Sequence, residues 1–243
     1  MDFTYEPAIH FQEVSYSVND LIILKNITGS IPKGKITTLV GPSGAGKTTL
    51  LKMCNGLLSP TTGTIFIDDQ PITAYEPTAL RKYVGIALQS APMIAGTVID
   101  NLALPNSLQG EKLTQQEAIQ YLQDVGLDES FLHRSASELS GGQRQKVSIA
   151  RTLINKSSIL LLDEITSALD RQSVQDIEAL ILTLNKKYKV TIIWITHNLQ
   201  QALTIGHYTW VMMDGELIET GESSLLNKPK NHRVAEFVQG VNT

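Results

Sequence analysis

The stretch at residues 36–49, ITTLVGPSGAGKTT, decides the fold of this chain. It opens with a β-branched, apolar run, Ile36–Val40, that is typical of a short buried strand. Residues 41–48 then fit the pattern G-x-x-x-x-G-K-[ST], and apolar residues recur afterwards at helical spacing. A strand, a glycine-rich loop and a helix in this order predict a phosphate-binding loop in an α/β domain.

The glycines of this loop let the backbone curl so that successive N–H groups point inward, and the following helix adds the positive end of its dipole. Lys47 can reach the β- and γ-phosphates of a nucleotide, and the Thr48 hydroxyl can bind Mg²⁺. The predicted nucleotide-binding residues of this loop are Gly41, Pro42, Ser43, Gly44, Ala45, Gly46, Lys47, Thr48 and Thr49. Kinases, GTPases and many ATPases share such a loop, so other motifs must decide the class.

A second apolar strand ends in two acids. The run Ile159–Asp163, ILLLD, is followed directly by Glu164. An Asp in this position can hold Mg²⁺ opposite Thr48. Because side chains alternate along a strand, the next carboxylate points elsewhere and is free to act as a general base on an attacking water. Strands often end in solvated charges, and the phosphate loop upstream is what favours the catalytic interpretation.

The segment LSGGQ at residues 139–143 predicts a second anion site. Ser140 and Gln143 have the spacing of a capping box, which marks the start of a helix. Two glycines, Gly141 and Gly142, lie in its first turn, where each weakens a helix by roughly 0.5–1 kcal/mol relative to alanine. Their presence is understandable if something must approach the backbone closely.

Composition narrows the class further. The chain has 243 residues, a formal net charge of −4 and one cysteine, Cys54. An acidic balance argues against a general nucleic-acid binder, and one cysteine excludes an internal disulfide. We expect Cys54 to be a small buried apolar side chain. No basic flank and apolar core of a secretory signal opens the sequence, and its apolar runs are far shorter than the roughly 20 residues of a membrane helix.

The order of the patterns predicts an α/β fold. Two β-prone runs around Asn19 and Asp20 open the chain, a polar-faced helical pattern fills residues 97–154, and strands then alternate with helices, including one over residues 173–185. Such alternation implies a mostly parallel sheet covered on both faces. We therefore expect a single domain over residues 1–243. Its parts are an antiparallel β subdomain with the start of the core (1–90), an inserted helical subdomain (91–155), and the rest of the core with a helical tail (156–243).

Together, the phosphate loop, LSGGQ, the LLLDE strand and the downstream His197 resemble an ATP-binding cassette (ABC) ATPase over nearly the whole chain. The resemblance implies a P-loop NTPase (RecA-like) core that uses ATP and Mg²⁺. It also implies an ATP-hydrolysing subunit that powers solute transport through a separate transmembrane permease. Such a subunit is cytoplasmic and lies on the cytoplasmic face of the cell membrane.

In that family two cassettes pack head to tail, so that ATP on the phosphate loop of one copy is closed over by LSGGQ of the other. The resemblance therefore implies an ATP-dependent homodimer in which Ser140, Gly141, Gly142 and Gln143 contact the γ-phosphate held by a second copy.

Three further residues match family positions. Gln89 matches the glutamine that senses Mg²⁺ and water while its loop touches the membrane subunit. His197 matches the switch histidine that contacts the γ-phosphate and orients Glu164. Asp170, in the segment SALD, matches the aspartate that couples the two sites across the dimer.

Two positions depart from the family pattern. The aromatic residue that usually stacks on adenine aligns with Val18, and Tyr16 lies two residues earlier, on the same face because residues two apart on a strand share one. We expect Tyr16 to substitute for it. Ile165 follows the acid pair where many relatives have proline. DEITSALD and GTVIDNLALP resemble the small FetA/YbbL-type cassettes proposed to drive iron export.

Two other classes fit less well. Soluble ABC proteins that act on ribosomes or DNA generally carry two cassettes or a long coiled coil, whereas this chain has one phosphate loop and no sustained heptads. A small-molecule kinase would share the loop, but LSGGQ and the acid pair are not expected of one. The transported solute and the direction of transport are not encoded in these motifs.

Overall fold

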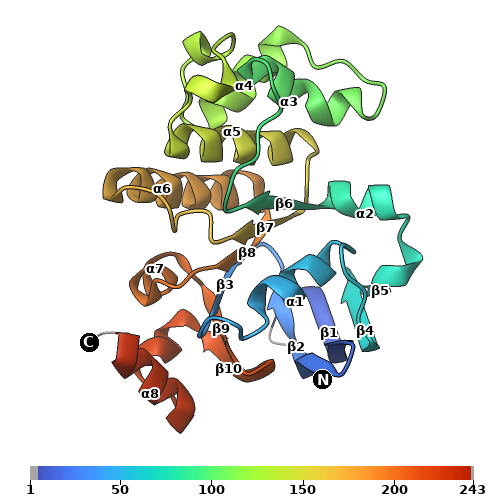
Figure 1. Cartoon of the computed structure of the whole chain (residues 1–243), viewed down its shortest axis with the longest axis vertical. Coiled ribbons are helices and arrows are strands. Elements are labelled where there is room, and N and C mark those ends of the chain that lie inside the picture. Colours follow the sequence, from blue (N-terminus) through green and yellow to red (C-terminus); the bar gives the residue numbers. More distant parts are fainter. Residues whose placement is uncertain (1–4, 242–243) are drawn as a thin grey trace.

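The computed structural model describes residues 5–241 of the chain (Figure 1). A six-stranded sheet crosses the middle of the molecule, a four-stranded sheet packs at one side of it, and a group of helices extends from the opposite end. The mixed α/β architecture with an antiparallel sheet, a parallel sheet and inserted helices is the predicted one. The predicted divisions after residues 90 and 155 stay predictions.

The N-terminal region forms the antiparallel sheet, in the order β2-β1-β4-β5. Its strands are β1 (Pro7–Val18), β2 (Leu21–Pro32), β4 (Thr62–Ile67) and β5 (Gln70–Pro71). Asn19 lies in the predicted turn between β1 and β2, with a φ of 51°. The pairing register of β1 with β2 shifts on both sides of Tyr16, so side chains there do not alternate regularly between the two faces.

The six-stranded sheet has the order β10-β9-β3-β8-β7-β6. Its strands are β3 (Ile36–Val40), β6 (Val84–Leu88), β7 (Ile159–Asp163), β8 (Thr191–Ile195), β9 (Tyr208–Met213) and β10 (Glu216–Glu222). Every neighbouring pair is parallel except the hairpin of β9 and β10. The carboxyl ends of β3, β7 and β8 therefore meet at one edge, and the predicted motifs leave the sheet there.

Helix α1 (Lys47–Cys54) lies between the two sheets. Its buried residues join one apolar cluster with side chains of both sheets, such as Phe11 of β1 and Ile193 of β8. Cys54 belongs to this cluster, and burial raises the pKa of its thiol to about 12. This agrees with the prediction of a small buried side chain.

The inserted helices are α3 (Val98–Ser107), α4 (Gln115–Asp124) and α5 (Gly141–Ile154), at the top of Figure 1. The capping boxes predicted at the start of α4 and α5 are both formed. A third one, Thr97 with Asp100, begins α3 and was not predicted. One apolar cluster runs from these helices into the six-stranded sheet, so the insertion and the core share buried surface.

The remaining α-helices of the described chain are α2 (Pro77–Tyr83), α6 (Arg171–Tyr188), α7 (Leu199–Ile205) and α8 (His232–Val241). Short 3₁₀ turns lie at Ile72–Ala74, Glu129–Phe131, Ala136–Glu138 and Ser223–Asn227. Helix α6 exceeds the expected residues 173–185 at both ends. Asp170 caps it at the start, and it ends on Lys189 in the left-handed region rather than on a glycine.

Candidate active site

Glycines are required at both ends of the phosphate loop. Gly41 follows β3 with a φ of 143°, and a Cβ there would lie 1.9 Å from the Met212 carbonyl oxygen of β9. Gly46 precedes α1 with a φ of 91°, and a Cβ there would lie 2.5 Å from a methyl carbon of Leu24. Only glycine adopts such conformations at no steric cost while allowing so close an approach. The loop therefore has the backbone curl that the motif predicts.

Lys47 is the first residue of α1, and only 5% of its surface is exposed. Its ammonium donates to the carbonyl oxygens of Gly41 at 2.8 Å and Pro42 at 2.9 Å. Burial lowers the pKa of Lys47, while the charges of Glu164 and Asp163 act in the opposite direction. A buried cation at a helix N-terminus, beside inward-curled backbone, suits a bound phosphate.

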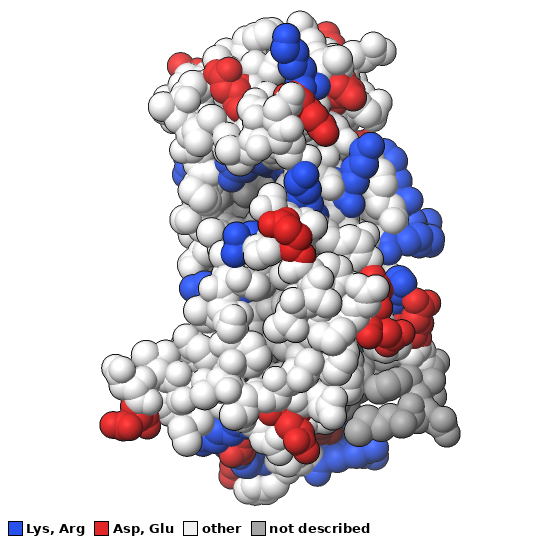
Figure 2. All heavy atoms as spheres, turned by 90° about the vertical axis from the view of Figure 1, so that its right-hand side faces the viewer, with Lys and Arg blue, Asp and Glu red and all other residues white. Residues whose placement is uncertain are grey.

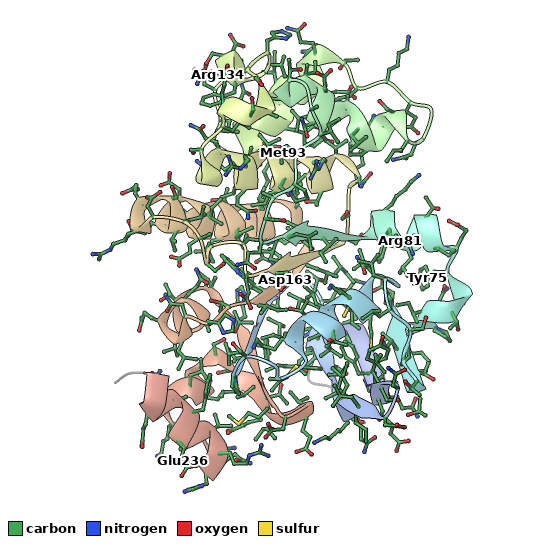
Figure 3. The ribbon with its side chains drawn as sticks, in the orientation of Figure 1. Tyr75, Arg81, Met93, Arg134, Asp163 and Glu236 are labelled. Carbon is green, nitrogen blue, oxygen red and sulfur yellow. The ribbon has the colours of Figure 1, made fainter. Side chains whose placement is uncertain are left out.

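Asp163 ends β7 near the centre of the molecule (Figure 3). Its Oδ1 accepts a hydrogen bond from the Thr48 hydroxyl at 3.1 Å. Burial raises the pKa of Asp163, and this hydrogen bond partly offsets that effect. A hydroxyl and a carboxylate are oxygen ligands of the kind Mg²⁺ prefers. Within residues 5–241 no group of three or more His, Cys, Asp or Glu side chains could hold a metal ion.

Glu164 and His197 meet beside the loop. Glu164 has a φ of 49°, uncommon for a residue with a side chain, directly after β7. Its Oε1 lies 2.6 Å from Nε2 of His197, which comes from the end of β8. Both side chains line a cavity of about 340 Å³ together with residues 43–49. The structure therefore brings Glu164 and His197 together beside the predicted phosphate loop, while their roles as base and switch histidine stay predictions.

Gln89 follows β6 and is connected to Glu164 through the Ser167 hydroxyl. Its Nε2 donates to the Ser167 hydroxyl at 2.8 Å, and that hydroxyl donates to the Glu164 carbonyl oxygen at 2.9 Å. The side chain is thus tied to the backbone of the predicted base. Direct contact of Gln89 with Mg²⁺ stays a prediction.

Gln145 was missed by sequence reasoning. It is only 2% exposed on α5, and its Nε2 donates to the carbonyl oxygens of Gln89 at 2.6 Å and Leu88 at 3.2 Å. Gln145 therefore fastens the Gln89 loop to the helix that begins with LSGGQ. The only local signal was a glutamine amid the apolar positions of α5.

LSGGQ begins α5 as predicted. The Ser140 hydroxyl accepts from the Gln143 N–H at 3.3 Å, and the Gln143 side chain accepts from the Ser140 N–H at 2.9 Å. A Cβ on Gly142 would lie 2.9 Å from the Ser173 hydroxyl oxygen, so α6 of the same chain already approaches this glycine closely. None of residues 140–143 lines the phosphate-loop cavity. One copy of the chain therefore keeps its two predicted anion sites apart.

Asp170 caps α6. Its carboxylate accepts from the Ser173 hydroxyl at 2.6 Å and from the Ser173 N–H at 3.0 Å, and these hydrogen bonds lower the pKa of Asp170. Because Ser173 also touches Gly142, the cap of α6 and the start of α5 are adjacent. A coupling role across a dimer stays a prediction.

The adenine contact has less support. Tyr16 is partly buried against the apolar cluster that both sheets share, and Val18 is 45% exposed at the end of β1. Ile23 of β2 lines the phosphate-loop cavity, whereas neither Tyr16 nor Val18 does. The register shifts around Tyr16 also remove the regular alternation on which the shared face depended. Stacking of adenine on Tyr16 stays a prediction.

Comparison with known proteins agrees with this geometry. A family model described as "ABC transporter" matches residues 24–167, which is more than half of the chain. The chain belongs to the ABC transporter family. Within it, the chain is an ATP-binding, ATP-hydrolysing subunit.

Individual ABC relatives extend the match to almost every residue. The putative ABC transporter ATP-binding protein YjkB of Bacillus subtilis is 43% identical over 96% of this chain and 95% of its own length. The probable iron export ATP-binding protein FetA of Escherichia coli is 34% identical over 79% of this chain and 85% of its own. A solved dimeric ATP-binding cassette in a post-hydrolysis state, bound to ADP and Pi, superposes with a TM-score of 0.77 at 30% identity. It covers 88% of this chain and 98% of its own.

Within residues 5–241 of this ABC subunit, no helix is both long enough and apolar enough to cross a membrane.

Proposed function

We propose that two copies of this ABC subunit close head to tail on two ATP molecules with Mg²⁺ and thereby drive a separate membrane-spanning permease. The observation that carries the proposal is one cavity lined by the buried Lys47, by Thr48 and by the Glu164–His197 pair. Asp163 lies beside it, hydrogen-bonded to the Thr48 hydroxyl. These are the groups that phosphoryl transfer to water requires: an anion cradle, oxygen ligands for a metal, and a base held by a partner.

In this proposal each side chain has one task. Lys47 and the N–H groups of the loop bind the β- and γ-phosphates, and Thr48 and Asp163 hold Mg²⁺, which when bound neutralises charge on the phosphate oxygens. Glu164 accepts the proton of the attacking water. His197 orients that carboxylate through the hydrogen bond between Nε2 of His197 and Oε1 of Glu164.

The second copy is needed because LSGGQ of one chain does not line the cavity of that chain. The helix N-terminus of α5, with the Ser140 hydroxyl, would supply the missing side of the pocket from the partner. The related cassette solved as a dimer supports this arrangement. Donors of this kind are preorganised around the charge that develops in the reaction, and removing one lowers the rate by about 10²–10³-fold.

Because the relatives are named as ATP-binding proteins of transporters, we place this chain on the cytoplasmic face of the membrane beside a permease. Iron export is our proposal for the cargo, because FetA is a relative and bears that name.

Replacing the base tests the proposal. Glu164→Gln keeps the size of the side chain, so we expect ATP binding to persist while turnover falls by about 10²–10⁴-fold. Glu129→Gln, far along the chain on an exposed turn, is the matched control and should hydrolyse ATP at the normal rate. ATP binding and phosphate release are measured on the same samples. Normal turnover in Glu164→Gln would remove Glu164 from the role of base.

The partner and cargo need a separate experiment. The chain is purified from native membranes with an affinity tag, and the recovered spanning subunit is reconstituted with it in vesicles. We expect ATP-dependent movement of iron, and none with Glu164→Gln. Recovery of the chain without a spanning subunit would contradict the permease proposal. Transport of a different solute would contradict the proposal of iron as the cargo and leave the permease proposal standing.

A further inference from the structure

A second cavity lies at the opposite edge of the six-stranded sheet from the phosphate loop. Its floor is formed where β7 begins at Ile159 and β8 begins at Thr191, whereas Glu164 and His197 follow the other ends of the same strands. The volume is about 470 Å³, larger than the 340 Å³ of the phosphate-loop cavity. Cavities of this size hold small organic molecules. The mechanism of ATP hydrolysis uses none of its residues.

Its walls come from both parts of the molecule. Tyr121 of α4 and Leu153 of α5 line it from the inserted helices, and Ala8 of β1 with Val190 before β8 line it from the core. Most of this lining is apolar, which favours a ligand with an apolar body.

Three tyrosines, one each from α2, α4 and α6, give the cavity aromatic surface. The Tyr83 hydroxyl donates to Asp68 and the Tyr188 hydroxyl donates to Asp124, so two of the rings are anchored at their far ends. Burial raises the pKa of Tyr83, Tyr121 and Tyr188, so all three stay neutral near pH 7. Anchored neutral rings suit a flat ligand that stacks on them.

The charged lining is basic. It comprises three lysines, Lys33, Lys156 and Lys189, against one acid, Asp68, which pairs with Lys33 at 3.1 Å. Within residues 5–241 neither the Lys156 nor the Lys189 ammonium has a hydrogen bond or ion pair. The pKa of Glu117 is lowered mainly by the hydrogen bonds that its carboxylate makes with Thr114 in the capping box of α4, and the charge of Lys156 helps to lower it. Figure 2, which shows the right-hand side of the molecule in Figure 1, has Lys and Arg side chains half-way up, with a group of acids below them.

Lys156 and Lys189 also hold unusual backbone positions. They follow the ends of α5 and α6 with φ of 53° and 55°, where glycine is the ordinary residue. Complementing the helix dipole does not require them, because Arg151 already lies in the last turn of α5, and Lys186 and Lys187 in that of α6. Two lysines in a strained conformation at the rim of one cavity are better explained by a ligand they face.

We propose that this cavity binds a flat aromatic molecule carrying one carboxylate. The rings and apolar walls hold the body of the ligand, and the two free ammonium groups hold its charge. A phosphate is the weaker fit, because the groups at the rim are helix carboxyl ends rather than amide-rich helix N-termini. The proposal concerns binding only, and it stands independently of the function proposed above.

The test compares two ligands of nearly equal shape, 1-naphthoate and the uncharged 1-naphthalenemethanol. Their binding to the full chain is measured by calorimetry with saturating ADP, so that the phosphate-loop site is filled. We expect one naphthoate per chain, bound about tenfold tighter than the alcohol, as two partly exposed ion pairs would give.

Substituting both rim lysines should remove the preference. Lys156→Gly with Lys189→Gly suits the left-handed backbone, so the double variant should melt no lower than the natural chain. We expect it to bind the two ligands equally, whereas Lys186→Gln with Lys228→Gln, which also removes two charges, should keep the tenfold difference. Tyr121→Ala should weaken both ligands. The proposal is overturned if neither ligand binds at its solubility limit, if both bind the natural chain equally, or if the preference survives in the glycine variant.

Discussion

Helices α1 and α5 begin alike and end up in different surroundings. Helix α1 follows the glycine-rich phosphate loop, helix α5 begins with two glycines, and each was predicted to point its amino terminus at a phosphate. The start of α1 is completed within the chain, because Asp163, Glu164 and His197 come to it from neighbouring strand ends. The start of α5 has its own capping box, the hydrogen bond from Arg144 to the Leu139 carbonyl oxygen, and the nearby Ser173 of α6, and it lies outside the phosphate-loop cavity. This difference indicates that one copy holds a complete phosphate-binding loop, whereas its LSGGQ segment lacks a binding partner within the described residues of the same copy.

The largest effect that separates the two helices should come from Ser140→Ala. If α5 acts on ATP bound to another copy, turnover should fall by about 10²–10³-fold while the affinity of ATP for α1 stays unchanged. The substitution also removes a helix cap, which is worth about 1 kcal/mol. Thr114→Ala removes the equivalent cap of α4 and controls for that loss. Equal turnover in the two variants would mean that α5 serves stability alone.

Lys47→Ala tests the other helix. Removing the buried ammonium takes away charge-assisted bonds to phosphate, so ATP should bind on the order of 10²-fold more weakly. Equilibrium dialysis with labelled ATP measures it. Lys52→Ala, in the last turn of the same helix, is the control and should bind normally. Undiminished affinity in Lys47→Ala would remove the cradle assignment.

Gln145→Leu should have an intermediate effect. The Gln89 and Leu88 carbonyl oxygens would lose their shared donor, so the link between α5 and the Gln89 loop would loosen and turnover should fall roughly tenfold, with ATP affinity kept. Gln109→Leu, which removes hydrogen bonds elsewhere in the inserted helices, is the matched control. A loss of ATP affinity equal to the loss of turnover would argue for general destabilisation instead.

Tyr16→Ala should have the smallest effect. If the ring contacts adenine, ATP should bind several-fold more weakly, in line with the low end of base stacking, about 1 kcal/mol, while inorganic triphosphate should bind as before. Equal losses for the two ligands would exclude stacking.

The sequence predicted the parts of the site that depend on local chemistry. The loop, the acid pair after β7 and the capping box of α5 are each written in consecutive residues, because backbone conformation and helix starts are local properties. The meeting of Glu164 with His197 was expected only from the resemblance to the ABC family, because a lone histidine at a strand end does not by itself predict it. The contacts of Gln145 and Ser167 could not be predicted in this way. Gln145 donates to the Gln89 carbonyl oxygen, which is 56 residues away in the sequence, and Ser167 accepts from the Gln89 side chain, which is also far from it in the sequence.

The fold was predicted to a similar depth. Continuous apolar runs identified the central strands, but the bulges beside Tyr16 came from pairing across β1 and β2, which no single strand encodes. The same limit applies to the aromatic cavity. Tyr83, Tyr121 and Tyr188 are far apart in the sequence, and only the packing of three helices against the sheet places them together.

The account depends most on the site being shared between copies, and sedimentation of Glu164→Gln with and without ATP tests this directly. We expect a single copy of 26.7 kDa without nucleotide and a species of twice that mass with ATP and Mg²⁺. Adding Ser140→Arg to the same chain should prevent the larger species while ATP still binds. A chain that stays single with ATP bound, and whose unsubstituted form hydrolyses ATP at the same rate per copy at every dilution, would contradict the account.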